Sequence, residues 1–322
     1  VFDSHISALY EERVIEGYWE VHYKNNYRVP FVAFFGQSER FKRSGQDPST
    51  DLTGRWSCTF ELGSPSEYPA LAELKQEGNH LSGTFLTETG DYRYLEGLVQ
   101  GNDFKLSCFD GAHAFLFEGK ITGPDSIQGT FLSGKHYSTY WSGVRDENAQ
   151  LDTPLGLNTF DKERIAELRG INLSGKEVST LDPKYQGSPK VVIIMGTWCP
   201  NCRDANQFLK SFISDNPGIQ DSVIFQAIAF EAYNDQDRNL RSIQRYIDRM
   251  QIPFDIWLGG NKDKEEASEN VDAIDKVISY PTMIFIDDQD RIKYVHTGFS
   301  GPATEEYGEF KDLFVSLLDS IK

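Results

Sequence analysis

The stretch that decides the fold of the second half of the chain is Val191-Val192-Ile193-Ile194-Met195-Gly196-Thr197-Trp198-Cys199-Pro200-Asn201-Cys202. Its first five residues are apolar, as in a strand that is buried on both faces. Pro200 suits the first turn of a helix, because it has no N–H to satisfy there and its φ is already helical. The stretch therefore predicts a buried strand, a short turn and a helix that begins at Cys199.

The predicted helix gives its two cysteines different surroundings. Cys199 lies at the helix N-terminus, where unpaired backbone N–H groups and the helix dipole favour a thiolate. Cys202 follows one turn later, on a stripe that faces the core together with Ala205, Asn206, Leu209 and Ile213. We expect Cys199, at the exposed helix tip, to attack a disulfide, and Cys202 to resolve the mixed disulfide that forms.

The spacing of the two cysteines also suits zinc ligands or two buried structural cysteines. A tetrahedral zinc site needs two further ligands, whereas Cys58 and Cys108 stand in the first half of the chain without a CxxC or HxxxH partner. The combination of strand, Trp198, CxxC and helix favours redox chemistry over both alternatives. We expect no metal and no other cofactor.

Around this stretch the pattern is one of strands alternating with helices, which predicts an α/β layered fold. The expected elements are a hairpin (171–180), the buried strand (190–195), a helix (199 to about 214), a second strand (223–229), an amphipathic helix (237–250), an acidic helical insert (262–271), a hairpin (282–286 with 291–296) and a C-terminal helix (305–321).

The first half of the chain alternates short aromatic or β-branched runs with Gly, Asn and Asp turns, which predicts an all-β domain. The expected strands are 18–24, 31–35, 55–61, 70–77, 81–87, 93–99, 104–109, 114–120, 126–132 and 137–144. Gly17-Tyr18-Trp19 recurs as Gly54-Arg55-Trp56, which favours sequential hairpins that close into a barrel or a sandwich. This Gly-x-Trp pattern is similar to lipocalin-like barrels, and it fits either a ligand cavity or plain aromatic core packing.

Composition limits the partners and the organisation. The chain has 322 residues and a formal net charge of −17, and neither half is basic, which argues against nucleic acid or an anionic lipid surface as a partner. No apolar run approaches the roughly 18 residues of a membrane-spanning helix. We expect any export signal to have been removed or never to have existed. The polar segment 146–158 predicts a boundary between an all-β domain of unknown function (1–150) and a second domain (151–322).

Two motifs together resemble the thioredoxin superfamily: Trp198-Cys199-x-x-Cys202 after an apolar strand, and Tyr280-Pro281-Thr282 before a later strand. The resemblance covers about residues 160–322. The early hairpin, the long segment between Val223 and Pro281 and the run at 297–302 are similar to the TlpA and ResA-like branch, whose members are disulfide reductases of the bacterial cell envelope or periplasm.

This resemblance implies a thiol-disulfide oxidoreductase that reduces or isomerises protein disulfides, with a disulfide-containing protein as substrate and an upstream electron donor protein. It also implies that Pro281 is the family's cis-proline, which exposes the Tyr280 backbone to pair with an extended substrate. The residues implied in substrate binding are Trp198, Pro200, Asn201, Tyr280 and Thr282.

The sequence also departs from the family. Thioredoxins carry a buried acid six residues before the first cysteine, where this chain has Ile193. The ResA-like branch carries a Glu three residues after the second cysteine, where this chain has Ala205. Asp204 should point to solvent, so Glu231 is the remaining candidate proton acceptor for Cys202, with water or substrate as the alternative.

Two other functions fit parts of the sequence. A peroxiredoxin-like peroxidase would need a Thr three residues before its cysteine, within a Pro-rich approach, whereas Thr197 stands two before Cys199. A β-domain that chooses the partner, with a secondary redox role, would be favoured by a large cavity or an exposed aromatic groove and disfavoured by a solid core. Cys58 and Cys108 either pair with each other or remain separate thiols.

Overall fold

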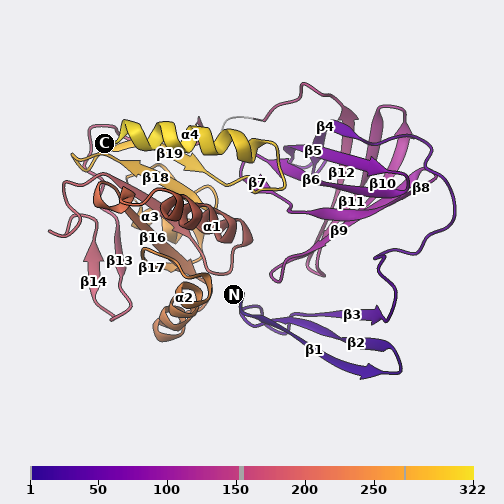
Figure 1. Cartoon of the computed structure of the whole chain (residues 1–322), viewed down its shortest axis with the longest axis horizontal. Helices are drawn as coiled ribbons and strands as arrows, with labels where there is room; N and C mark the ends of the chain where they lie inside the picture. The colour runs from indigo at the N-terminus through magenta and orange to yellow at the C-terminus, as the bar shows by residue number, and fades with distance from the viewer. Residues whose placement is uncertain (1, 152–155, 272) are drawn as a thin grey trace. The chain divides into compact units, whose positions relative to one another are not determined.

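The computed structural model describes residues 2–151, 156–271 and 273–322 (Figure 1). Two compact units divide the chain, one spanning Asp3–Leu151 and the other running from residue 152 to the C-terminus. The first is all-β, and the second contains every α-helix of the described residues.

Eight antiparallel strands of the first unit close into a barrel. Each strand pairs with the next along the chain, and the last pairs back with the first through Trp141 opposite Phe60. The strands are β4 (Gly54–Phe60), β5 (Tyr68–Glu77), β6 (His80–Thr87), β8 (Leu95–Gln100), β9 (Asp103–Phe109), β10 (Ala114–Gly123), β11 (Ser126–Ser133) and β12 (Tyr137–Arg145), with the short β7 (Gly90–Asp91) beside β6. The prediction of an all-β barrel or sandwich is therefore confirmed, and the structure is a barrel.

Aromatic side chains fill the inside of this barrel. The rings of Phe85 and Phe117 stack with centroids 4.4 Å apart, and Phe60 contacts several neighbouring rings. The aromatic side chains of the barrel that are exposed by 2 % or less are Trp56, Phe60, Phe85, Phe104, Phe117, Phe131 and Trp141. Trp56, from the second Gly-x-Trp motif, is part of this aromatic core. Cys58 in β4 and Cys108 in β9 are both free thiols, so the pairing alternative is wrong for this structure.

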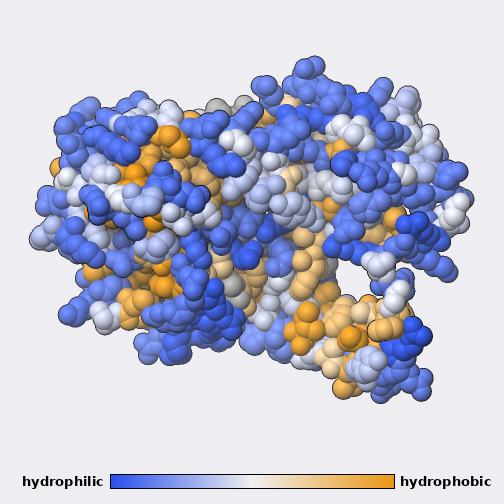
Figure 2. All heavy atoms as spheres, viewed as in Figure 1, coloured by the Kyte–Doolittle hydropathy of each residue, from blue (hydrophilic) through white to orange (hydrophobic). Residues whose placement is uncertain are grey.

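A separate three-stranded sheet precedes the barrel, formed by β1 (Ser4–Glu11), β2 (Val14–Val21) and β3 (Arg28–Phe34). The sequence predicted no strand at β1 and began the next one at Tyr18. Gly17 instead lies inside β2, where an added Cβ would stand 2.1 Å from the Ser7 carbonyl oxygen, so glycine is needed for the close approach to β1. Apolar side chains such as Leu9 and Tyr10 are exposed on this sheet (Figure 2).

The second unit is built on a seven-stranded mixed sheet in the order β14-β13-β17-β16-β15-β18-β19. Its strands are β13 (Arg169–Ile171), β14 (Glu177–Ser179), β15 (Lys190–Met195), β16 (Ile224–Glu231), β17 (Asp255–Asn261), β18 (Thr282–Ile286) and β19 (Ile292–Thr297), and its α-helices are α1 (Pro200–Asp215), α2 (Gln236–Met250), α3 (Lys264–Asn270) and α4 (Glu306–Ser320). This arrangement confirms the predicted thioredoxin-like α/β fold.

Strand β17 is the element of this unit that the sequence missed. Its second half contains Gly259 and Gly260, which lower the strand propensity of an isolated segment. In the fold, β17 pairs parallel with β16, and that tertiary pairing holds it extended. Elsewhere the unit's core is built from apolar strands and helix faces; for example, Phe208 of α1 packs 4.9 Å from Phe314 of α4.

Candidate active site

Four strand ends meet at one edge of the sheet, and the cysteine pair lies there. β15, β16 and β17 run parallel, so their carboxyl ends share an edge. Met195 leads from β15 toward Cys199, and Glu231 ends β16. β18 runs antiparallel to β15, which brings its beginning, directly after Pro281, to the same edge. Residues far apart in the sequence therefore converge around the first turn of α1.

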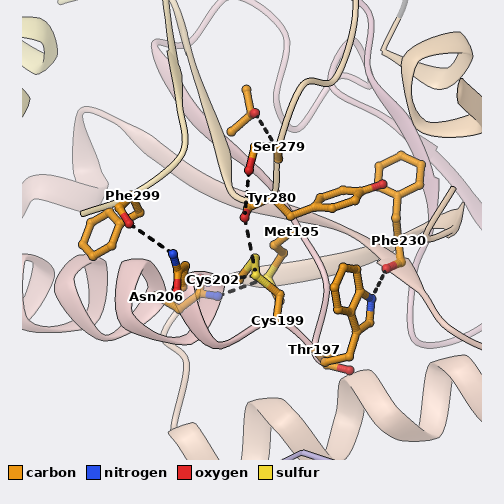
Figure 3. Close-up of a disulfide and its surroundings, with 12 residues drawn as sticks. Met195, Thr197, Cys199, Cys202, Asn206, Phe230, Ser279, Tyr280 and Phe299 are labelled. Atoms are coloured by element: carbon orange, nitrogen blue, oxygen red, sulfur yellow. Dashed lines mark hydrogen bonds between the residues drawn. A yellow bond between two sulfur atoms is a disulfide. The ribbon is translucent and has the colours of Figure 1, made fainter. Parts of the chain in front are cut away.

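Cys199 and Cys202 form a disulfide, with their Cα atoms 5.2 Å apart. Cys199 is the N-cap of α1, in an extended conformation, and Pro200 occupies the first turn as the sequence predicted. The backbone N–H of Cys202 donates to the Cys199 sulfur at 3.2 Å (Figure 3). This donor points at the atom on which a thiolate would carry its charge, so the helix end favours the ionised form of Cys199.

Burial differs from the prediction at one of the two cysteines. Cys202 is fully buried, and Asn206 and Leu209 on the same stripe are exposed by no more than 1 %, as expected. Cys199 is only 5 % exposed, so the expectation of an exposed helix tip is wrong. The reason is tertiary, because the carbonyl oxygen of Tyr280 lies 3.5 Å from the Cys199 sulfur.

The loop before β18 supplies this neighbour. The Tyr280–Pro281 peptide bond is cis, as the family resemblance implied. The Pro281 carbonyl accepts a hydrogen bond from Gly298 N–H at 2.8 Å, which ties the loop to the segment after β19. Cys199, Cys202 and Pro281 are thus brought together, while their catalytic roles remain predictions.

Trp198 is fixed beside the disulfide by backbone and ring contacts. Its Nε1–H donates to the Phe230 carbonyl at 2.9 Å, and its ring meets that of Tyr280 edge-on with centroids 5.6 Å apart (Figure 3). The Trp198 indole can occupy this position only because residue 196 is glycine, since a Cβ there would lie 2.3 Å from Trp198 Nε1. These contacts fix the Trp198 ring in one position beside the turn that carries Cys199.

Glu231 is buried at the end of β16, with 2 % of its surface exposed. One carboxylate oxygen accepts from the Thr197 backbone N–H at 2.8 Å, and the other accepts from the Thr197 hydroxyl at 2.7 Å. The carboxylate thus holds the residue that stands two before Cys199. Through these contacts Glu231 positions Thr197, and its role as proton acceptor for Cys202 remains a prediction.

Asp204 does not point to solvent as the sequence predicted. Its side chain is only 13 % exposed and lies 3.8 Å from an Arg203 guanidinium nitrogen. A helical-wheel argument places it correctly around α1 but cannot see what packs beside the helix. Ile193 and Ala205, at the positions of the two family acids, are fully buried apolar residues.

The remaining residues predicted for substrate binding have different surroundings. Pro200 is buried, and Asn201, which is partly buried, donates from its side chain to the Phe299 carbonyl at 3.5 Å. Thr282 is fully buried and its hydroxyl donates to the Ser279 carbonyl at 2.8 Å. The burial of Thr282 speaks against a direct contact of its side chain with a substrate.

Lys262 is a neighbour of the site that the sequence analysis did not single out. It follows β17, and its ammonium nitrogen lies 5.6 Å from the centroid of the Trp198 ring. Burial lowers the pKa of Lys262. The sequence analysis assigned Lys262 to a helical insert, because it did not predict β17, which ends one residue earlier. Within the part of the chain that the structure describes, no three His, Cys, Asp or Glu side chains are arranged to hold a metal ion.

Comparison with known proteins agrees with this fold. Residues 159–310 match the family model Redoxin. The match covers most of the second unit, whose α/β fold is thioredoxin-like. A search of curated proteins found no match. None of the helices in the described residues has the length and apolarity to span a membrane.

Several solved structures are similar to about half of this chain. A thiol:disulfide interchange protein of the thioredoxin family from Chlorobium tepidum TLS is 18 % identical, with a TM-score of 0.36, over 50 % of this chain and 99 % of its own. A DsbF homologue from Corynebacterium diphtheriae is 20 % identical, with a TM-score of 0.36, over 53 % and 98 %. A thioredoxin-like protein from Porphyromonas gingivalis is 20 % identical, with a TM-score of 0.35, over 50 % and 95 %.

Proposed function

We propose that this protein is a thiol-disulfide oxidoreductase that reduces or isomerises protein disulfides through the Cys199–Cys202 pair. The observation that carries the proposal is the placement of that disulfide at the N-terminus of α1, with the Tyr280 carbonyl 3.5 Å from the Cys199 sulfur. The helix end favours a reactive thiolate at Cys199, and the Tyr280 backbone beside it is the group that we expect to pair with an extended substrate.

The reaction follows from the two sulfurs. In the reduced protein the Cys199 thiolate attacks one sulfur of a substrate disulfide, breaking the S–S bond and releasing the other sulfur as a thiolate that takes up a proton. Cys202 then loses its proton and attacks Cys199, which forms the Cys199–Cys202 bond and releases the second substrate thiol. An electron donor protein returns the pair to the dithiol. Glu231 or water takes the proton of Cys202 in this proposal.

We place the protein in the bacterial cell envelope or periplasm, as a TlpA-like member of its superfamily with an all-β domain over 1–150 and the redox domain over 151–322. The support is the family resemblance together with a CxxC pair that forms a disulfide. Its substrate is a protein that contains a disulfide. Nucleic acid is not a partner, since the chain carries a net charge of −17.

The test compares two single substitutions in the full chain. Cys199→Ser should abolish reduction of a disulfide-bonded protein such as insulin, whereas Cys202→Ser should trap a covalent mixed disulfide that mass spectrometry detects. In the reduced protein, iodoacetamide should modify Cys199 faster than Cys202, because only Cys199 has a helix-end donor and residual exposure. Faster alkylation of Cys202 would reverse the two roles.

A matched control tests whether the activity belongs to the Cys199–Cys202 pair. Cys108→Ser removes a partly buried thiol of the barrel and should leave insulin reduction unchanged.

A peroxide assay separates this activity from that of a peroxidase. The wild-type protein should consume hydrogen peroxide much more slowly than it reduces insulin. If the wild-type protein reduced peroxide and left insulin intact, the proposed oxidoreductase would be excluded in favour of a peroxiredoxin-like enzyme.

A further inference from the structure

A buried amide lies one helical turn after Cys202. Asn206 is fully buried on α1, and its side-chain nitrogen lies 3.1 Å from both the Met195 sulfur and the Tyr246 hydroxyl. Among the residues that the structure describes, none is a hydrogen-bond partner of its side-chain oxygen in this disulfide form of the protein. Buried amide oxygens are almost always paired, so this one calls for an explanation.

The orientation of the Asn206 amide follows from its neighbours. A thioether sulfur can only accept, so the group that faces Met195 must be the NH2. Burial raises the pKa of Tyr246, and its neutral hydroxyl can accept the second N–H of the same NH2. Both N–H groups of the Asn206 amide are therefore paired, and its carbonyl oxygen can be satisfied only by a donor from another residue.

Cys202 is the residue placed to supply that donor. Side chains in an α-helix lean toward the N-terminus, so a residue at i+4 covers the residue at i, with Cβ atoms about 5–6 Å apart. Asn206 is four residues after Cys202 on the buried side of α1, and its amide contacts Met195 at the end of β15 (Figure 3). In the disulfide the Cys202 sulfur carries no proton, and it cannot donate.

We propose that Asn206 is a positioning residue whose side-chain oxygen accepts a hydrogen bond from the Cys202 thiol once the disulfide is reduced. This inference rests on the proposed redox function of the pair. The bond forms only in the dithiol state, so it stabilises that state and keeps the proton on Cys202 while Cys199 carries the negative charge. The neutral Asn206 amide is thus the polar group beside Cys202, because Ile193 and Ala205 occupy the two positions at which the family carries an acid.

The consequence is a shift in the redox equilibrium. Two molecules of glutathione reduce the Cys199–Cys202 bond, and one S–S bond breaks while that of glutathione disulfide forms. One proton stays on Cys202, and the other stays on Cys199 or passes to water. In Asn206→Leu the dithiol loses its hydrogen bond and the disulfide loses its unpaired oxygen. The equilibrium constant for reduction should therefore fall about tenfold, which corresponds to a potential about 30 mV more negative.

Two control variants test whether the effect belongs to this oxygen. Gln226→Leu removes another buried amide with an unpartnered oxygen, three residues before the Ala229 that pairs with Met195, and should leave the potential unchanged. Tyr246→Phe removes a partner of the Asn206 nitrogen but keeps the oxygen, and it should shift the equilibrium less than threefold. Equal shifts in all three variants would mean a general packing effect and would overturn the proposal.

A direct measurement covers the case in which Asn206→Leu does not fold. Infrared spectra of the reduced wild-type chain should contain an S–H stretching band at lowered frequency that disappears in Cys202→Ser, as expected for a hydrogen-bonded thiol. A free-thiol frequency for that band would overturn the inference. If the wild-type pair did not exchange with glutathione at all, the proposed function itself would fail, and the infrared result would still decide the hydrogen bond.

Discussion

Replacing Glu231 by leucine should loosen the turn that carries Cys199. The carboxylate is 2 % exposed and accepts from both the N–H and the hydroxyl of Thr197, at 2.8 and 2.7 Å. In Glu231→Leu the buried Thr197 N–H has no acceptor, and an unsatisfied donor of this kind costs about 1–3 kcal/mol. The lost bond between hydroxyl and carboxylate adds to this cost, for a total of about 2–4 kcal/mol.

Hydrogen exchange of the oxidised full chain, read by mass spectrometry, measures this effect locally. Peptides covering residues 190–200 should exchange faster in Glu231→Leu, and the urea midpoint of the unit from residue 152 onward should fall. Glu231→Gln is the matched control, because its remaining oxygen can accept from the Thr197 N–H. We expect the glutamine variant to lose only about 1 kcal/mol.

The same pair of variants tests the proton-acceptor role. An amide cannot take the proton of Cys202, so a base at this position would make Glu231→Gln as slow as Glu231→Leu in resolving a mixed disulfide. A positioning role predicts near-normal resolution in Glu231→Gln. If Glu231→Leu matched the wild type in both exchange and urea midpoint, the argument from the two Thr197 hydrogen bonds would be refuted.

Two further predictions concern His296 and Gly196. Burial lowers the pKa of His296 from 6.5 to about 4, so the folded state stays neutral where the unfolded chain binds a proton. Stability present above pH 6.5 should therefore fall by about 3 kcal/mol as the pH drops to 4, and urea midpoints of His296→Leu should lose most of this pH dependence. Gly196→Ala should displace the Trp198 indole from the Phe230 carbonyl, since the new Cβ would stand 2.3 Å from Trp198 Nε1, and a red shift of tryptophan fluorescence would report it. An unchanged spectrum would contradict that reasoning.

Local signals determined the central elements of the redox domain. The strand predicted at 190–195 is β15, and the helix predicted from Cys199 is α1, which begins at Pro200. A continuous apolar run and a proline in the first helical turn act within a few residues, so they are legible without the rest of the chain. The burial of Cys202 followed in the same way from helical periodicity.

The tertiary structure alone decided what surrounds the cysteines. Strand order brings Glu231 to Thr197 and the Tyr280 carbonyl to Cys199, across sequence separations of 34 and 81 residues. Helical periodicity predicted an exposed Cys199 and a solvent-facing Asp204 because it describes one helix and ignores the elements packed beside it. Pairing between distant strands depends on the whole sheet, and the burial and the hydrogen bonds of the site therefore come from the fold.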